Sequence, residues 1–180
     1  YEKANFVVPK ISNEKQEFGL ASYKILNEFY PEIIEEIKGF ANGIKDSDKN
    51  LGAFLLSLGI FDITWQCSVF AFKTRDSTII GGNYDMLFEF KKFTIGFHFI
   101  VRKILENCSS TKEAIEIIQT AKVSSANNFL IADQFGDIAV VESAPQKSKI
   151  RRPQSKENYL YITNQFMTKE MKSYDKGGVE

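Results

Sequence analysis

The amino-acid sequence predicts an α+β fold, in which helices and antiparallel strands occupy separate stretches of the chain. The first third of the chain carries a helical apolar period, and two strand–turn–strand patterns follow, separated by a helical segment. Hairpins with segregated helices are typical of α+β domains rather than of parallel α/β sheets. With 180 residues, 43% of them hydrophobic, the chain can bury a core and suits one domain with a small appendage.

The helical period is clearest from residue 23 onward. Its apolar residues recur every four positions, at Ile25, Phe29, Ile33 and Ile37. Because Pro31 interrupts this stripe, we expect one short helix ending near Tyr30 and a second beginning at Pro31. Further helices are expected at 48–58, at 101–107, and after Ser109-Ser110-Thr111, where Glu113 completes a capping-box pattern.

The strand signals are β-branched and aromatic runs bounded by turn residues. The sequence predicts strands at 63–73, 78–82, 93–99, 128–133, 137–142 and 159–163. Residues 145–157 read as a basic, polar loop. Arg151 and Arg152 in that loop could meet an anionic substrate, or they could simply be solvated.

Composition excludes several classes of function. Lys plus Arg equals Asp plus Glu at 23 each, so a general nucleic-acid binder is not expected. Two cysteines without a CxxC spacing, together with a single His98, argue against a disulfide scaffold and a zinc site, and no metal or cofactor is expected. The apolar stretch 51–72 is long enough to suggest a transmembrane helix, but Asp62, Gln66 and two glycines argue against a membrane span. No signal peptide is visible, which favours a cytoplasmic location.

Cys67 is the first candidate for chemistry, and three interpretations stay open for it. It could be a buried structural cysteine on an apolar strand. It could pair with His98 as in papain-like enzymes, although a lone His between two phenylalanines is more often a packed strand residue. If the chain is cut before Cys67, the new α-amine has a reference pKa of about 7.7–8.0 and can take the proton of a thiol with a reference pKa of about 8.5.

Two polar positions could serve such a nucleophile. Gly81-Gly82-Asn83-Tyr84-Asp85 follows the second strand of the hairpin that Cys67 begins, so Asp85 could return toward Cys67. Asn164 ends the last predicted strand, where a side-chain amide could donate to an oxyanion. Each could equally be an ordinary loop carboxylate or turn asparagine.

Four motifs in chain order carry a family resemblance. They lie at 67–70, 81–86, 128–142 and 161–164. In this order they resemble the choloylglycine hydrolase and penicillin acyltransferase group, which are linear-amide C–N hydrolases of the N-terminal-nucleophile superfamily. The acyltransferase branch is the more similar, since a helical segment precedes the cysteine and the second motif reads Asn-Tyr-Asp. The resemblance covers roughly residues 20–166.

The resemblance implies a mechanism and a fold. Cys67 would be the nucleophile, exposed by autocatalytic cleavage of the Gln66–Cys67 bond, and its amine the general base. Asp85 would orient that amine, Asn164 would supply an oxyanion donor, and Asn83 and Tyr84 would line the substrate pocket. Residues 1–66 would form a helical pro-segment, and residues 67–180 an N-terminal-nucleophile domain built as a four-layer αββα sandwich. The expected partner is a small-molecule acyl amide, with no nucleic acid and no membrane, in a homo-oligomer.

The sequence also departs from the family pattern. Gln66 replaces the usual glycine before the cleaved bond, and Gly82 stands where the bile-salt branch has arginine. The stretch between Asp85 and Val101 is several dozen residues shorter than in the family, so we expect the printed sequence to lack stretches near residues 90–94 and 100–101 and after residue 180. These departures keep two alternatives open: an unprocessed or non-catalytic binding member of the same fold, and a generic α+β interaction domain.

Overall fold

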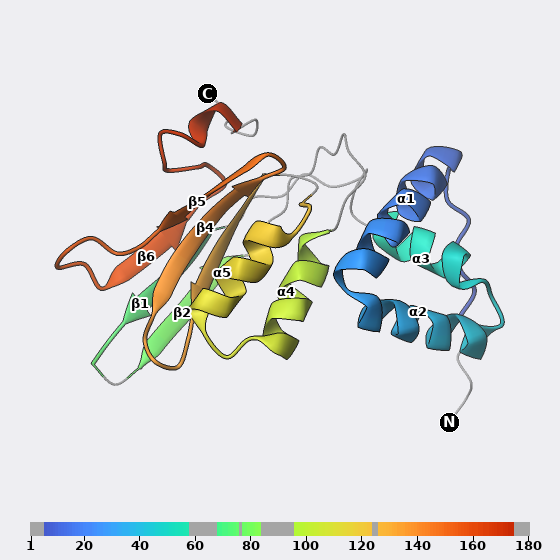
Figure 1. The fold of residues 1–180 in the computed structure, drawn as a ribbon, viewed down its shortest axis with the longest axis horizontal. Helices are drawn as coiled ribbons and strands as arrows, with labels where there is room; N and C mark the ends of the chain where they lie inside the picture. Colours follow the sequence, from blue (N-terminus) through green and yellow to red (C-terminus); the bar gives the residue numbers. More distant parts are fainter. Residues whose placement is uncertain (1–5, 58–67, 76, 84–95, 124–125, 175–180) are drawn as a thin grey trace.

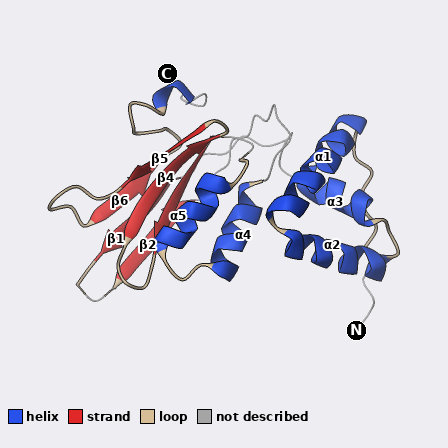
Figure 2. Cartoon of the chain, viewed as in Figure 1, coloured by secondary structure: helices blue, strands red, loops and turns tan. Residues whose placement is uncertain are grey.

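The computed structural model describes residues 6–57, 68–75, 77–83, 96–123 and 126–174. Within these ranges the chain forms five α-helices and two three-stranded antiparallel sheets. Figure 2 shows the sheets at one end of the molecule and a group of three helices at the other, with two more helices between them. This mixed and segregated arrangement agrees with the predicted α+β class.

The N-terminal helices form a compact group of three (Figure 1): α1 (Asn13–Phe29), α2 (Pro31–Ile44) and α3 (Asp48–Ser57). The break at Pro31 is confirmed, since this proline occupies the first turn of α2. The first helix begins ten residues before the apolar stripe at residue 23. Ser12 caps it by accepting a hydrogen bond from the backbone amide of Lys15, and Phe18 turns toward the core.

The first sheet has the strand order β2-β1-β6. It contains β1 (Ser68–Lys73), β2 (Thr78–Asn83) and β6 (Tyr159–Ile162). The predicted hairpin and last strand are therefore confirmed within the described residues, while the predicted strand residues 63–67 lie outside them. β1 is the central strand, and both of its neighbours run antiparallel to it.

The second sheet has the strand order β3-β4-β5. It contains β3 (Asn127–Ala132), β4 (Ile138–Ala144) and β5 (Lys147–Arg151). The predicted β3–β4 hairpin is confirmed, and Gly136 supplies the positive φ of 81° that its turn requires. The expected loop at 145–157 is wrong in its first half, because β5 pairs along the edge of β4 from Lys147 to Arg151.

Two further helices follow: α4 (Phe97–Asn107), which packs against α5, and α5 (Thr111–Thr120), which packs on the second sheet. The predicted capping box at Ser110 and Glu113 is present. The strand expected at 93–99 is wrong where it is described, because residues 97–99 form the first turn of α4. There the helical spacing of Phe97, Ile100 and Ile104 directs apolar side chains into the core.

The two sheets pack face to face. Ala71, Leu160 and Ile162 of the first sheet meet Ile138 and Val140 of the second in one buried cluster. The other face of the second sheet packs against α5, and a larger cluster continues through α4 into the N-terminal helices. The described residues thus form, in order, a helix layer, a sheet and a second sheet.

The outer face of the first sheet is apolar and exposed. Its side chains come from all three strands: Phe70, Phe72, Ile79, Tyr159 and Tyr161. No other described element packs over this face. None of the described helices is both long and apolar enough to cross a bilayer.

Candidate active site

Three strand ends meet at one edge of the first sheet. Ser68, the first residue of β1, pairs with Asn83, the last residue of β2. On the other side of β1, Val69 pairs with Ile162, the last residue of β6. The chain therefore enters β1 and leaves β2 and β6 at the same edge, where segments far apart in the sequence are side by side.

The predicted site residues lie on or next to these strand ends. Gln66, Cys67, Tyr84 and Asp85 are outside the described residues. Cys67 immediately precedes Ser68 in the sequence. The structure describes only the backbone of Asn83, and Asn164 is exposed in the turn that follows β6.

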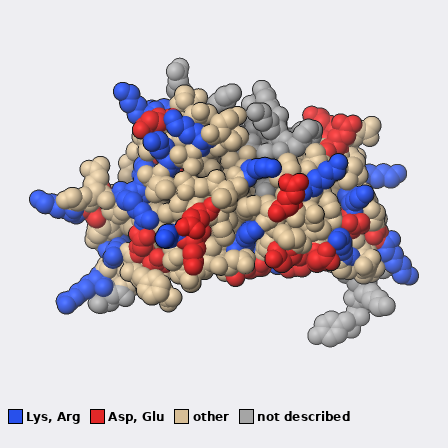
Figure 3. Space-filling model, in the orientation of Figure 1, with Lys and Arg blue, Asp and Glu red and all other residues tan. Residues whose placement is uncertain are grey.

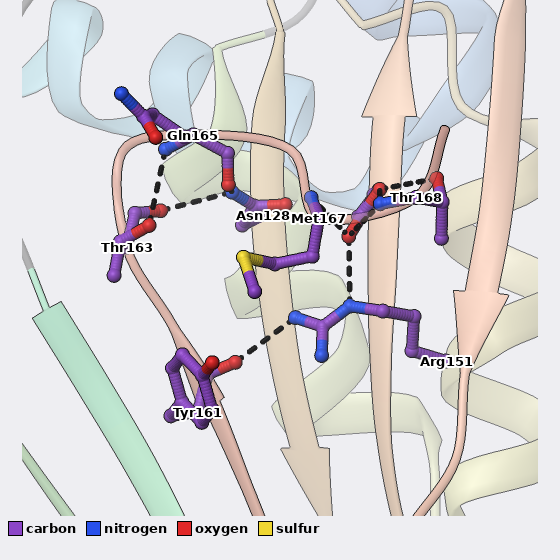
Figure 4. Close-up of polar contacts among 8 residues, drawn as sticks. Asn128, Arg151, Tyr161, Thr163, Gln165, Met167 and Thr168 are labelled. Atoms are coloured by element: carbon purple, nitrogen blue, oxygen red, sulfur yellow. Dashed lines mark hydrogen bonds and ion pairs between the residues drawn. The ribbon is translucent and has the colours of Figure 1, made fainter. Parts of the chain in front are cut away.

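The turn after β6 is held by a side chain from the other sheet. Asn128, in β3, donates two hydrogen bonds through its Nδ2 atom, one to the backbone oxygen of Thr163 at 2.9 Å and one to that of Gln165 at 3.2 Å. These two carbonyls flank Asn164 on either side. Figure 4 shows the amide of Asn128 reaching from its strand to this turn. The Oδ1 atom of Asn128 is buried and has no hydrogen-bond partner among the residues that the structure describes.

A buried carboxylate lies opposite Asn128 in the β3–β4 register. Glu142 is fully buried and pairs with Asn128 across the two strands. It accepts hydrogen bonds from the backbone amides of Met167 at 2.9 Å and Thr168 at 3.1 Å, and from the hydroxyl of Thr168 at 2.6 Å. Arg151 completes the set with an ion pair from Nε at 2.7 Å (Figure 4).

These contacts keep Glu142 charged. Burial by itself disfavours the carboxylate, but the donors from Thr168, Met167 and Arg151 outweigh it and lower the pKa of Glu142. Arg151 also donates from its terminal guanidinium nitrogen to the backbone oxygen of Tyr161 at 2.9 Å. Segment 161–168 is therefore fixed by hydrogen bonds before, within and after the turn that carries Asn164.

The sequence motif contained Asn128 and Glu142, but no role was predicted for either. Their place in the strand register could have indicated a role for them. In β3 and β4 the residues that face the first sheet form apolar pairs, Ala132 with Ile138 and Leu130 with Val140, and the next pair along is Asn128 with Glu142. A polar pair that continues an apolar row is a buried polar site, which must be satisfied by hydrogen bonds.

The two other candidates for thiol chemistry have different surroundings. His98 lies in α4, not on the strand expected for it, and lines a cavity of about 760 Å³ between α2 and α4. Desolvation by the surrounding protein lowers the pKa of His98. Because Cys67 is outside the described residues, the Cys67–His98 pairing stays untested. Cys108 caps the end of α4, and burial followed by the charges of Glu113 and Glu116 raises the pKa of its thiol.

The arginines expected in a solvated loop have partners. Arg151 belongs to β5 and binds Glu142, and Arg152 forms an ion pair with Asp137. Figure 3 shows acidic and basic side chains interspersed on the visible face, without a large area of one sign. In the part of the chain that the structure describes, no group of three His, Cys, Asp or Glu side chains could hold a metal ion.

A comparison with curated proteins gives no match. A comparison with protein families gives one: the sequence profile of acyl-coenzyme A:6-aminopenicillanic acid acyl-transferase matches residues 73–177. The matched range contains the positions of Asp85, Asn128, Glu142 and Asn164 and begins after Cys67. Because it covers more than half of the chain, the protein belongs to the acyl-coenzyme A:6-aminopenicillanic acid acyl-transferase family, a group of acyltransferases and hydrolases.

Proposed function

We propose that the protein is an N-terminal-cysteine amide hydrolase or acyltransferase that acts on linear C–N amide bonds. The observation that supports this most directly is the meeting of three strand ends at one edge of the first sheet, because each borders a predicted site residue. Family membership supports the acyl chemistry. The predicted residues are Cys67 as nucleophile, Asp85 as the partner of its amine, and Asn164 as an oxyanion donor.

The nucleophile is generated from the chain itself. The Cys67 thiol attacks the carbonyl carbon of Gln66, the peptide C–N bond breaks, and the resulting thioester is hydrolysed by water. Residues 1–66 then end in a carboxylate, and Cys67 carries a free α-amine. That amine accepts the thiol proton at neutral pH, since its reference pKa of about 7.7–8.0 lies close to that of the thiol.

Turnover follows the same steps on an external amide. The Cys67 thiolate attacks the acyl carbon, a C–S bond forms, and the carbonyl electron pair moves to oxygen, where Asn164 donates a hydrogen bond. The oxyanion then collapses, the C–N bond breaks, and the leaving amine takes a proton from the α-ammonium group. Water or an acceptor amine attacks the thioester and releases the product. Asn83 and Tyr84 are proposed to contact the acyl amide.

The complete fold proposed for this function is the four-layer αββα sandwich, in which a further helix layer covers the outer face of the first sheet. Three layers in the expected order support it. The small acyl amide substrate and a homo-oligomeric assembly remain predictions. Light scattering on the purified protein tests the assembly, and a panel of chromogenic acyl 4-nitroanilides tests the substrate class.

The deciding experiment is intact-mass spectrometry of the purified chain and of a Cys67→Ala variant. We expect the wild-type protein to separate under denaturing conditions into fragments 1–66 and 67–180, and to form a thioester at Cys67 with 4-nitrophenyl acetate. The Cys67→Ala variant is expected to stay uncleaved and unlabelled, whereas Cys108→Ala behaves as wild type. An intact Gln66–Cys67 bond without labelling would instead support the non-catalytic binding alternative.

A further inference from the structure

We propose that Asn128 is a positioning residue for the reaction: through two hydrogen bonds it fixes the turn that presents Asn164 to the oxyanion, with Glu142 and Arg151 fixing the flanking backbone. This inference rests on the proposed function, because it assigns Asn128 a role through Asn164. It goes beyond that function by placing part of the machinery on the second sheet.

Asn128 holds the turn through main-chain atoms only. Both bonds go to main-chain oxygens, those of Thr163 and Gln165, so the amide bridges the residues on either side of Asn164. A bridge of this kind restrains the backbone of the middle residue through its neighbours and does not itself use the Asn164 side chain. It also joins the second sheet to the end of β6, which belongs to the first.

The backbone on both sides of the turn is also held by side chains of the second sheet. Arg151 donates to the Tyr161 oxygen ahead of the turn, and Glu142 accepts from the Met167 and Thr168 amides behind it. Because Glu142 is opposite Asn128 in the strand register, both groups project from one end of the inter-sheet layer. The turn is therefore held at several points along eight residues, although its middle residue is exposed.

The polar groups around the turn are costly in free energy. A buried carboxylate–arginine pair is often no more stabilising than an apolar pair of similar size, and the buried Oδ1 of Asn128, which has no hydrogen-bond partner among the described residues, adds a desolvation cost. An apolar pair in place of Asn128 and Glu142 would have continued the row of apolar pairs at a lower cost in folding free energy. Oxyanion donors, by contrast, need close positioning, since a 1 Å error can lower a rate by about 100-fold. The polar groups therefore serve to position Asn164 rather than to stabilise the fold.

The test is a double-mutant cycle on acylation. Wild type, Asn128→Ala, Asn164→Ala and the double variant react with 4-nitrophenyl acetate. In this reaction the Cys67 thiolate attacks the ester carbon, the C–O bond breaks and 4-nitrophenolate leaves. We measure the rate of the 4-nitrophenolate burst per chain cleaved before Cys67. Asn128→Ala is expected to acylate about 10- to 100-fold more slowly, and the double variant no more slowly than Asn164→Ala.

Two further readouts separate positioning from a general loss of structure. Alkylation of Cys67 by iodoacetamide forms no oxyanion, so its rate is expected to stay within about twofold of wild type in Asn128→Ala. Amide hydrogen exchange at 163–166 is expected to become faster in this variant. If Asn128→Ala folds poorly, Thr168→Val replaces it, because it removes the hydroxyl donor to Glu142 and is expected to slow acylation with alkylation unchanged.

A matched control lies at the other end of β6. Asn158 donates through Nδ2 to the Lys73 oxygen at 3.1 Å, so Asn158→Ala removes a similar amide-to-backbone bond, which here joins the residue before β6 to the end of β1. It is expected to acylate at the wild-type rate. Normal acylation by a folded Asn128→Ala, or multiplicative effects in the double variant, would overturn the positioning role alone. A wild-type chain that is neither cleaved nor labelled at Cys67 would overturn the proposed function and this inference with it.

Discussion

At the scale of single residues, the most informative group is Glu142. Its side chain has no solvent exposure, yet it is the acceptor for two backbone amides, a hydroxyl and Arg151, whose side chain is 17% exposed. A buried carboxylate with this many hydrogen-bond donors is stable. If the carboxylate or Arg151 is removed, the remaining group is left buried without its charged partner. Glu142 therefore links the stability of the fold to the position of segment 161–168.

The Glu142→Gln variant is expected to lose about 3 kcal/mol of unfolding free energy at pH 7. The direction in which this stability difference changes with pH follows from the pKa of Glu142, which the fold lowers from its ordinary value of 4.5. As the pH falls below that value the unfolded chain takes up the proton first, so the wild-type advantage shrinks as the pH passes through the native pKa. Urea unfolding between pH 7 and pH 3 measures the difference in unfolding free energy between wild type and Glu142→Gln. Glu157→Gln, at an exposed position, should change stability by less than about 0.5 kcal/mol; a gap that stays constant with pH would contradict this account.

At the scale of elements, the N-terminal helices depend on the close approach of α1 to α3. A Cβ atom added to Gly19 would lie 2.2 Å from the backbone oxygen of Ala53, a distance that real Cβ contacts do not show. The same crossing places Gly52 against the ring of Tyr23. The two helices are therefore in contact at glycine residues, and a larger side chain there would have to move a whole helix.

Two alanine substitutions with opposite expected signs test this packing. Gly19→Ala should destabilise the protein by about 1–3 kcal/mol, because the added methyl group forces α1 away from α3. Gly39→Ala, in α2, should stabilise it by about 0.5–1 kcal/mol, because no described atom beyond the adjacent residues and the surrounding helix backbone lies within 4 Å of the new methyl group, and alanine favours the helix. Thermal unfolding of both variants gives the comparison. If Gly19→Ala were as stable as wild type, the close crossing would be wrong.

At the scale of the whole molecule, the N-terminal helices and the sheet domain share one core. Leu26, Ile34 and Ile37 belong to the same buried cluster as Ile100 and Ile118. Polar contacts join the two parts as well: Arg102 of α4 pairs with Glu36 of α2 at 2.7 Å, and Lys103 donates to the backbone oxygen of Phe29. Cutting the chain between the parts would leave these contacts in place.

We therefore expect fragments 1–66 and 67–180 to remain a one-to-one complex when they are produced as separate chains or by cleavage. Co-purification and calorimetry measure the association. Glu36→Lys should weaken it several-fold, since it places a positive charge beside Arg102, and an exposed pair contributes up to about 1 kcal/mol. Glu35→Lys is the matched control, because the ion pair that Glu35 forms among the described residues lies within α2, with Lys38. Fragments that elute separately at micromolar concentration would show that the pro-segment is released.

Local sequence patterns predicted much of the fold where one signal dominated. Pro31 marked the boundary between α1 and α2, Ser110 and Glu113 marked the start of α5, and turn residues marked the β3–β4 hairpin. The errors fell where packing outweighs local preference. Residues 97–99 are aromatic and strand-like in composition but belong to a helix whose apolar side faces the core, and 147–151 is polar yet completes the edge of a sheet.

The sequence by itself determined the α+β class, the hairpins and the family, because turn chemistry, caps and ordered motifs act over short spans of the chain. Only the tertiary structure decided that the ends of β1, β2 and β6 share one edge and that Asn128 reaches across to the turn of Asn164. Asn128 and Thr163 are 35 residues apart, so their contact depends on how two sheets stack rather than on any local period. The physical reason is that a buried polar group is satisfied by whatever partner packing brings to it.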